Sequence, residues 1–178
     1  MSHYLLGIDI GTSGCKVSIV NTCGQYISDG FTEYCSLPPY PGWSEQDPDF
    51  WLQASKASVK DALSSGKVSA DEVIGLTIDA SAHNAVLLDK DDRVLRPTIM
   101  WNDQRSVQEA EFLKKEYGSV IFKTTYNTPS PTWTLPQLLW IKHNEPAVFQ
   151  RIHRIMFLKD YVRYLFTGVC CTEHIEAQ

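Results

Sequence analysis

The chain has 178 residues, which suits one ordinary domain and is short for two. Hydrophobic residues make up 43% of it and charged residues 21%, which excludes a disordered chain and is typical of a soluble globular domain. The net charge of −5 disfavours a non-specific nucleic-acid binder, and no apolar run approaches the ~20 residues that cross a bilayer.

The first part of the sequence predicts three strands joined by short turns. Residues 4–10 (YLLGIDI) are a short apolar run of buried-strand type, and residues 15–21 alternate between apolar and polar side chains. Residues 25–34 have the pattern of a third strand. Glycine-containing turns at 11–14 and 22–24 separate the three runs. We therefore expect an antiparallel three-stranded meander.

A helix and two further strands follow the meander. Asp47 before Pro48 predicts a helix start, because Asp is a good N-cap and Pro suits the first helical position. We expect this helix to end at Gly66, a plausible C-cap. Residues 73–79 and 84–89 have strand-like apolar runs.

The second half of the sequence predicts mostly helices. Helical patterns run over residues 103–117, 135–142 and 160–166, with an irregular, proline-containing segment at 127–136. Residues 169–172 are expected to begin another strand. Together with the meander, these elements predict an α/β domain in which helices flank a mixed sheet.

The strongest chemical signal is the segment from Gly7 to Lys16, GIDIGTSGCK. Asp9 lies near the end of an apolar strand, where a carboxylate needs a cation or another partner. Glycines in the following turn allow backbone N–H groups to approach a phosphate closely, and hydroxyls add donors. Lys16 lies just beyond and can neutralise phosphate charge. The segment is not a Walker A loop, because a strand rather than a helix follows it.

The string GIDIGTS resembles the first phosphate motif of the actin, Hsp70 and sugar-kinase ATPases. This resemblance implies a ribonuclease H-like (actin-like ATPase) domain that uses ATP and Mg²⁺. It assigns to Asp9 the organisation of Mg²⁺ and its water. The phosphate cradle falls on Gly11, Thr12 and Ser13, with Lys16 as a supporting cation.

Four further segments resemble the FGGY family of carbohydrate kinases, most closely its xylulokinases. They cover the chain in order, so residues 1–178 are expected to be the family's N-terminal domain, incomplete at its C-terminal end and without the C-terminal domain. The segments are WSEQDP at 43–48, SAHNAVLLD at 81–89, LRPTIMWNDQR at 95–105 and LKDYVRY at 158–164.

In that family the second of these segments binds the sugar, which implies sugar contacts from the Ala82 backbone and from His83. Asp103 and Arg105 are also candidate sugar-binding residues, with a structural ion pair as the alternative. The sequence departs from the usual Gln-Met before the histidine, which is Ser81-Ala82 here, and has Asn84 where glycine is usual. These departures leave the identity of the sugar open.

The resemblance implies phosphorylation of D-xylulose to D-xylulose 5-phosphate by ATP. The catalytic base is expected beyond residue 178, so the chain alone is expected to be inactive. A substrate such as ribulose, gluconate or glycerol is an alternative, as are a nucleotide switch of the actin or Hsp70 kind and a binding module that has lost catalysis. The His83 and Trp101–Arg105 segments argue against the switch.

Five cysteines without C-x-x-C spacing argue against a disulfide framework and a zinc site. The N-terminal residues have no features of a secretory signal. We therefore expect a cytoplasmic protein whose partners are ATP and a ketose sugar, with no nucleic acid or membrane among them. A homodimer is also possible under this interpretation.

Overall fold

The computed structural model describes residues 3–36 and 38–176. It divides into two compact units, and each is made from several stretches of the chain. The first unit consists of Met1–Ser36, Asp49–Ser81 and Val162–Val169. The second consists of Leu37–Pro48, Ala82–Tyr161 and Cys170–Gln178.

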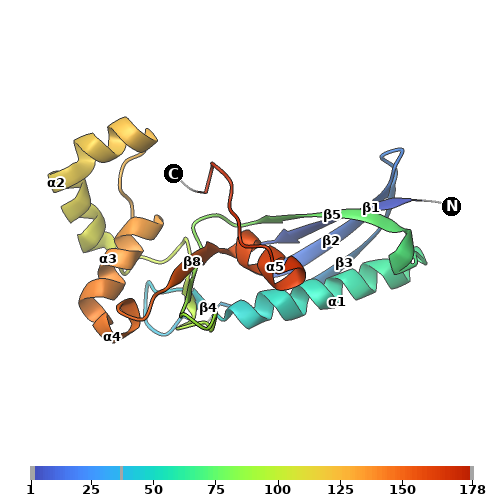
Figure 1. Cartoon of the computed structure of the whole chain (residues 1–178), viewed down its shortest axis with the longest axis horizontal. Helices are drawn as coiled ribbons and strands as arrows, with labels where there is room; N and C mark the ends of the chain where they lie inside the picture. The colour runs from blue at the N-terminus through green and yellow to red at the C-terminus, as the bar shows by residue number, and fades with distance from the viewer. Residues whose placement is uncertain (1–2, 37, 177–178) are drawn as a thin grey trace. The chain divides into compact units, whose positions relative to one another are not determined.

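The first unit is built on a four-stranded mixed sheet with the strand order β3-β2-β1-β5 (Figure 1). Strands β1 and β2 are antiparallel, as are β2 and β3, whereas β5 runs parallel to β1. The predicted meander and mixed sheet are therefore confirmed. The four strands are β1 (Tyr4–Ile10), β2 (Gly14–Asn21), β3 (Tyr26–Glu33) and β5 (Val73–Ala80).

Helix α1 (Pro48–Gly66) packs along one face of this sheet and begins and ends where the sequence predicts. Alternating side chains of β1 and β2 are buried, and Trp51 of the helix is fully buried. The helix comes so close to β3 that a Cβ atom on Gly30 would lie 2.3 Å from the carbonyl oxygen of Ser58. Close approach of backbone to backbone therefore requires glycine at this position.

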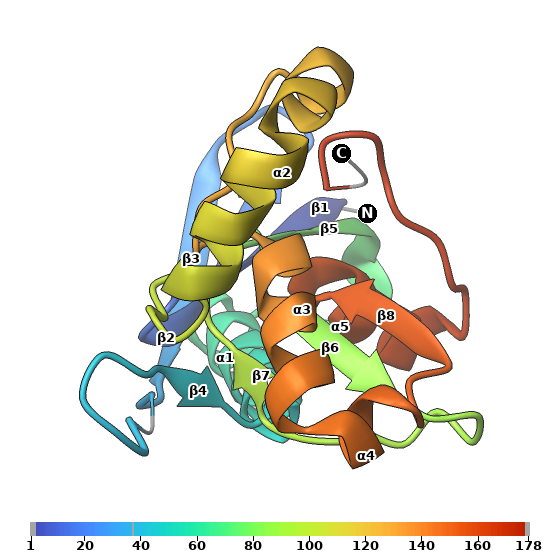
Figure 2. The same cartoon turned by 90° about the vertical axis from the view of Figure 1, so that its left-hand side faces the viewer.

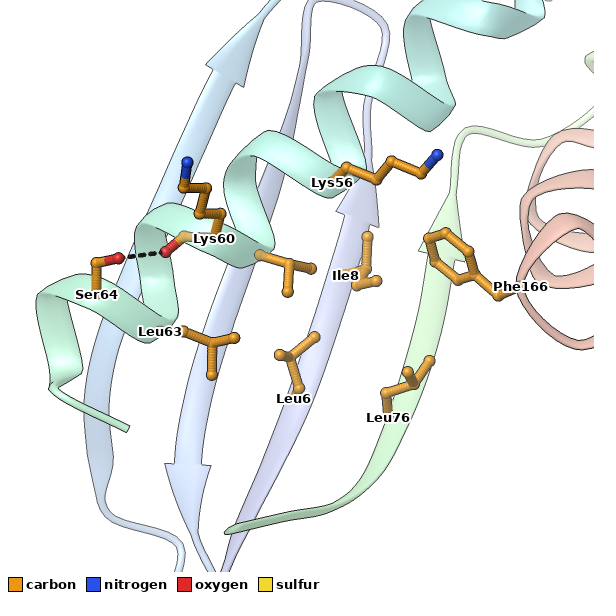
Figure 3. A pocket seen from close by; sticks show the side chains of 9 residues that line it. Leu6, Ile8, Lys56, Lys60, Leu63, Ser64, Leu76 and Phe166 are labelled. Atoms are coloured by element: carbon orange, nitrogen blue, oxygen red, sulfur yellow. Dashed lines mark hydrogen bonds between the residues drawn. The ribbon is translucent and has the colours of Figure 1, made fainter. Parts of the chain in front are cut away.

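An open apolar groove of about 540 Å³ lies beside α1 in the first unit (Figure 3). Leu6 and Ile8 of β1 and Leu76 of β5 form its floor, and Phe166 of α5 (Leu158–Thr167) lies at its side. Leu76 is 55% exposed. Among the described residues, β5 pairs with β1 alone. A 3₁₀ turn, η1 (Ala70–Glu72), precedes β5.

The second unit combines two short antiparallel strand pairs with three helices (Figure 2). Strand β4 pairs with β7, and β6 pairs with β8. Leu87, Ile99 and Ile141 form a buried cluster between these elements. The elements are β4 (Glu45–Gln46), β6 (Ala85–Leu88), β7 (Thr98–Ile99), β8 (Arg154–Phe157), α2 (Val107–Thr125), α3 (Thr134–Asn144) and α4 (Pro146–Phe149).

Two sequence predictions were wrong in this half of the chain. The helix predicted over 103–117 begins four residues later, because residues 103–105 form a buried ion pair instead of a helical turn. It continues to Thr125 and ends where Tyr126 takes a left-handed conformation with φ of 58°. The strand predicted at 169–172 is irregular chain. Within the described residues, no helix is long and apolar enough to span a membrane.

Candidate functional site

The predicted phosphate-binding residues lie around the turn between β1 and β2. The Gly11 N–H donates a hydrogen bond to the Gly14 carbonyl, with 2.9 Å between nitrogen and oxygen, and this bond closes the turn. Asp9 is exposed at the end of β1. It is directly opposite Lys16 of β2 and Asp79 of β5 in the strand register. Because paired residues share a face of the sheet, these three side chains project from the same face.

Tyr34 holds this turn from the end of β3. Its hydroxyl donates to the Gly11 carbonyl at 2.6 Å, and the Gly14 carbonyl lies 3.2 Å from the same oxygen. The Tyr34 N–H donates to the Ser13 carbonyl at 3.0 Å. Burial raises the pKa of the Tyr34 hydroxyl, so this group remains a protonated donor at neutral pH.

Lys16 forms an ion pair with Asp29, with 3.3 Å between the ammonium nitrogen and the carboxylate oxygen. Hydrogen bonds from Tyr26 and Lys16 lower the pKa of Asp29. About half of each side chain is exposed, so solvent and salt screen the pair strongly. The pair therefore holds Lys16 only weakly, and the ammonium group can turn towards an anion.

An exposed carboxylate at a strand end fits the way proteins bind Mg²⁺. This ion keeps several of its waters and is held by one or two carboxylates together with substrate phosphates. Asp9 supplies such a carboxylate beside the turn. In the part of the chain that the structure describes, no group of three or more His, Cys, Asp or Glu residues could hold a metal ion by itself.

The predicted sugar-binding residues Ala82 and His83 lie at the start of the longest stretch of the second unit, Ala82–Tyr161. His83 has a φ of 63°, in the left-handed region that a non-glycine residue rarely adopts. Its ring lies against Trp133, with 4.7 Å between the ring centroids and 34° between the planes. Ala82 is exposed and His83 is half-buried, so both can be reached by a ligand. Backbone strain of this kind persists where the surrounding structure holds it, often at functional sites.

Asn84 explains one of the departures from the family pattern. It is fully buried, and its side-chain carbonyl accepts a hydrogen bond from the Trp101 N–H at 2.8 Å. Its backbone carbonyl accepts a bond from the Leu158 N–H at 3.1 Å. A glycine would leave the Trp101 N–H without this bond. Asn84 therefore anchors the loop after β7 to the segment that carries His83.

Asp103 and Arg105 form a buried ion pair. The Arg105 Nη2 and Nε atoms lie 2.8 and 2.9 Å from the two carboxylate oxygens of Asp103. The Asp103 carboxylate also accepts the backbone N–H groups of Ser44 and Arg105 at 2.6 and 2.8 Å. A third donor of Arg105, Nη1, reaches Glu45 at 2.6 Å, and the guanidinium lies 3.8 Å from the ring centroid of Trp43.

The geometry therefore shows the structural ion pair that was the alternative to sugar binding for Asp103 and Arg105. The Arg105 side chain has no exposed surface and that of Asp103 has 1%. Contact of either residue with a sugar stays a prediction that nothing in the structure tests. The network continues to Arg96, which contacts Glu45 and lies 3.2 Å from Glu145.

The structure thus places the predicted site residues in two groups. Asp9, the Gly11–Ser13 turn and Lys16 lie together in the first unit, and Ala82, His83, Asp103 and Arg105 lie in the second. Sequence reasoning missed Tyr34. The register of β3 against β2 indicates the contact of Tyr34 with the turn. Glu33 is opposite Gly14 in this register, so the next residue, Tyr34, must reach the turn.

The profile of the FGGY family of carbohydrate kinases, N-terminal domain, matches residues 4–178. The chain belongs to this family. Among its FGGY relatives, xylulose kinase from Escherichia coli is 39% identical over 174 residues, and that from Bacillus subtilis is 34% identical over 174 residues. These alignments cover 97% and 98% of the chain but 35% of each relative. The chain thus spans about a third of the length of these relatives.

Solved FGGY structures have the same fold. The crystal structure of xylulose kinase from Rhodospirillum rubrum superposes with a TM-score of 0.88 at 27% identity, and covers 94% of this chain and 35% of its own. Gluconate kinase from Lactobacillus acidophilus gives 0.89 at 22% identity over 96% of this chain and 34% of its own. The α/β fold with a mixed sheet and flanking helices is therefore the actin-like ATPase fold of these sugar kinases, as predicted.

Proposed function

We propose that this chain supplies the phosphate-binding turn and part of the sugar pocket of an ATP-dependent sugar kinase. The proposed reaction transfers the γ-phosphate of ATP to D-xylulose and gives D-xylulose 5-phosphate. The observation that carries this proposal is the closed Gly11–Gly14 turn beside Asp9, in a chain whose family is the FGGY kinases. The relatives named xylulose kinase support the choice of sugar.

Asp9 would hold Mg²⁺ through the waters of the ion, and bound Mg²⁺ would neutralise charge on the transferred phosphate. Gly11, Thr12 and Ser13 would contact the phosphates, with Lys16 adding positive charge. His83, held by Trp133, would orient the sugar together with the Ala82 backbone. A catalytic base and the adenosine site are proposed to come from polypeptide outside residues 1–178, in the C-terminal domain.

This proposal includes a cytoplasmic location, where ATP is available, and small-molecule substrates without a nucleic-acid or membrane partner. A homodimer stays a prediction. Residues 1–178 form the N-terminal FGGY domain under this proposal, and they are expected to release no ADP by themselves, because the proposed base lies outside them.

The test measures sugar-dependent ADP release by the longest polypeptide encoded by the reading frame that contains these residues. Mg-ATP is supplied with D-xylulose, D-ribulose, L-ribulose, gluconate or glycerol in turn. We expect turnover with D-xylulose that Asp9→Ala abolishes. The matched control is Asp91→Ala, which removes an exposed carboxylate from a turn of the second unit and should leave turnover unchanged.

The outcomes separate the alternatives. Turnover with another compound of the panel would keep the kinase and change the sugar, and would direct attention to Ser81, Ala82 and Asn84. ATP hydrolysis without any sugar dependence would instead favour a nucleotide switch. Absence of both activities in a folded protein would favour a binding module that has lost catalysis.

A further inference from the structure

Tyr34 follows β3 directly and contacts the β1–β2 turn at three of its carbonyl groups. The hydroxyl donates to the Gly11 carbonyl and lies within hydrogen-bond distance of the Gly14 carbonyl, and the backbone N–H donates to the Ser13 carbonyl. The side chain is half-buried. One residue thus binds the turn at both of its ends and in between.

Such bonds matter because a turn with glycine at both ends has little stiffness of its own. A turn that binds phosphate must also keep its carbonyl oxygens away from the anion, since both are negative. Tyr34 holds the carbonyl oxygens of Gly11, Ser13 and Gly14 on its own side. The Gly11–Gly14 backbone bond alone restrains only one of these three carbonyls.

We propose that Tyr34 is a positioning residue that fixes the Gly11–Gly14 turn in its phosphate-binding conformation through its hydroxyl group. Tyr34 itself touches neither phosphate nor sugar in this role. The proposal rests on the proposed function, because it assigns phosphate binding to this turn. It adds a residue outside the GIDIGTS string to the machinery of the phosphate site.

The test compares Tyr34→Phe with wild type in the same full-length polypeptide. Phenylalanine keeps the ring and the backbone N–H and removes only the hydroxyl. Tyr117→Phe is the matched control, because Tyr117 is exposed on α2 in the second unit. Hydrogen exchange of the peptide that contains residues 11–14 is measured without nucleotide and with Mg-ATP, and KM is measured for Mg-ATP and for the sugar.

We expect Tyr34→Phe to accelerate exchange at residues 11–14 about five-fold without nucleotide, as loss of about one net hydrogen bond would do. The KM for Mg-ATP should rise about five-fold for the same reason, while the KM for the sugar stays within about two-fold of wild type. Tyr117→Phe should change none of these quantities. A purely structural contribution would lower the unfolding temperature without this difference between the two KM values.

Unchanged exchange at residues 11–14 in folded Tyr34→Phe would overturn the proposal. The proposal would also be overturned if exchange at residues 11–14 became faster but Mg-ATP protected these residues as well in Tyr34→Phe as in wild type. Tyr34→Leu adds a second comparison, because an effect of Leu that Phe lacks would assign the role to ring packing and refute the role of the hydroxyl. Protection of residues 11–14 by Mg-ATP is measured without turnover. A wild type that binds Mg-ATP but phosphorylates no sugar would therefore refute the proposed function, while hydrogen exchange would still decide the role of Tyr34.

Discussion

Asp103→Asn should destabilise the protein strongly, because it removes the negative charge next to a fully buried guanidinium. The carboxylate accepts four hydrogen bonds, one from the Ser44 N–H and three from Arg105. An asparagine amide keeps one acceptor oxygen and turns an NH₂ group towards one set of donors. Arg105 would retain Glu45 as its partner, but its main counter-charge would be lost.

The expected size of this effect is large. Removing one partner of a buried ion pair costs about 3–5 kcal/mol, and Glu45, which also pairs with Arg96, compensates the Arg105 charge only in part. A domain of this length loses about 2–4 °C of unfolding temperature per kcal/mol, so the expected fall is roughly 10 °C. Urea and thermal unfolding measure both quantities. The control is Asp91→Asn, an exposed carboxylate whose loss should change stability by no more than about 0.5 kcal/mol.

The same variant separates the two roles predicted for Asp103. If the residue is structural, Asp103→Asn should lower stability while the KM for the sugar, measured well below the unfolding temperature, stays close to wild type. A variant as stable as wild type with a sharply raised sugar KM would refute the reasoning. That result would show that the carboxylate contacts the sugar and that the ion pair contributes little.

Three further predictions concern packing, charge and the loop at His83. Gly30→Ala should lower the free energy of unfolding by about 2–3 kcal/mol, because the new Cβ would be overpacked against α1. Gly7→Ala, whose new Cβ would have nothing within 4 Å, should raise this free energy by about 0.5 kcal/mol. Urea unfolding checks both values. Hydrogen bonds from the Arg93 N–H, the Asp91 N–H and the Arg151 side chain lower the pKa of Asp89 in the folded protein. The stability that this carboxylate contributes is therefore present above its ordinary pKa and is lost as the pH falls through the pKa of the folded state. The urea midpoint should depend less on pH between about 5 and 3 in Asp89→Asn than in wild type. Asn84→Gly should cost about 1–3 kcal/mol by leaving a buried N–H without its acceptor, measured by the unfolding temperature.

The sequence predicted the parts of the fold that local patterns determine. The apolar run of β1, the alternation in β2 and the Asp47-Pro48 helix start predicted the meander and α1 almost to the residue. The turn at residues 11–14 was also located correctly, because its glycines, hydroxyls and flanking carboxylate form one continuous string, and phosphate binding by this turn stays a prediction.

The missed features depend on contacts between residues far apart in the chain. Strands β4 and β7 have two residues each and carry no periodicity that a sequence pattern could reveal. Helix α2 begins late because Glu45, about sixty positions earlier, shares in binding Arg105. The contact of Tyr34 with the turn follows from the register of β3 against β2, which the sequence alone does not specify.

The way in which the first unit is assembled from separate stretches has a consequence for synthesis on the ribosome. Its four strands and α1 are complete once Ala80 has been made, whereas Phe166, which flanks the apolar groove, follows only after most of the second unit. At a translation rate of about 5–20 residues per second, several seconds pass between the synthesis of Ala80 and that of Phe166, and Leu6 and Leu76 lack this neighbour during that time. The nascent chain therefore presents an apolar surface during translation, and slow codons between Ala80 and Phe166 should increase its capture by chaperones.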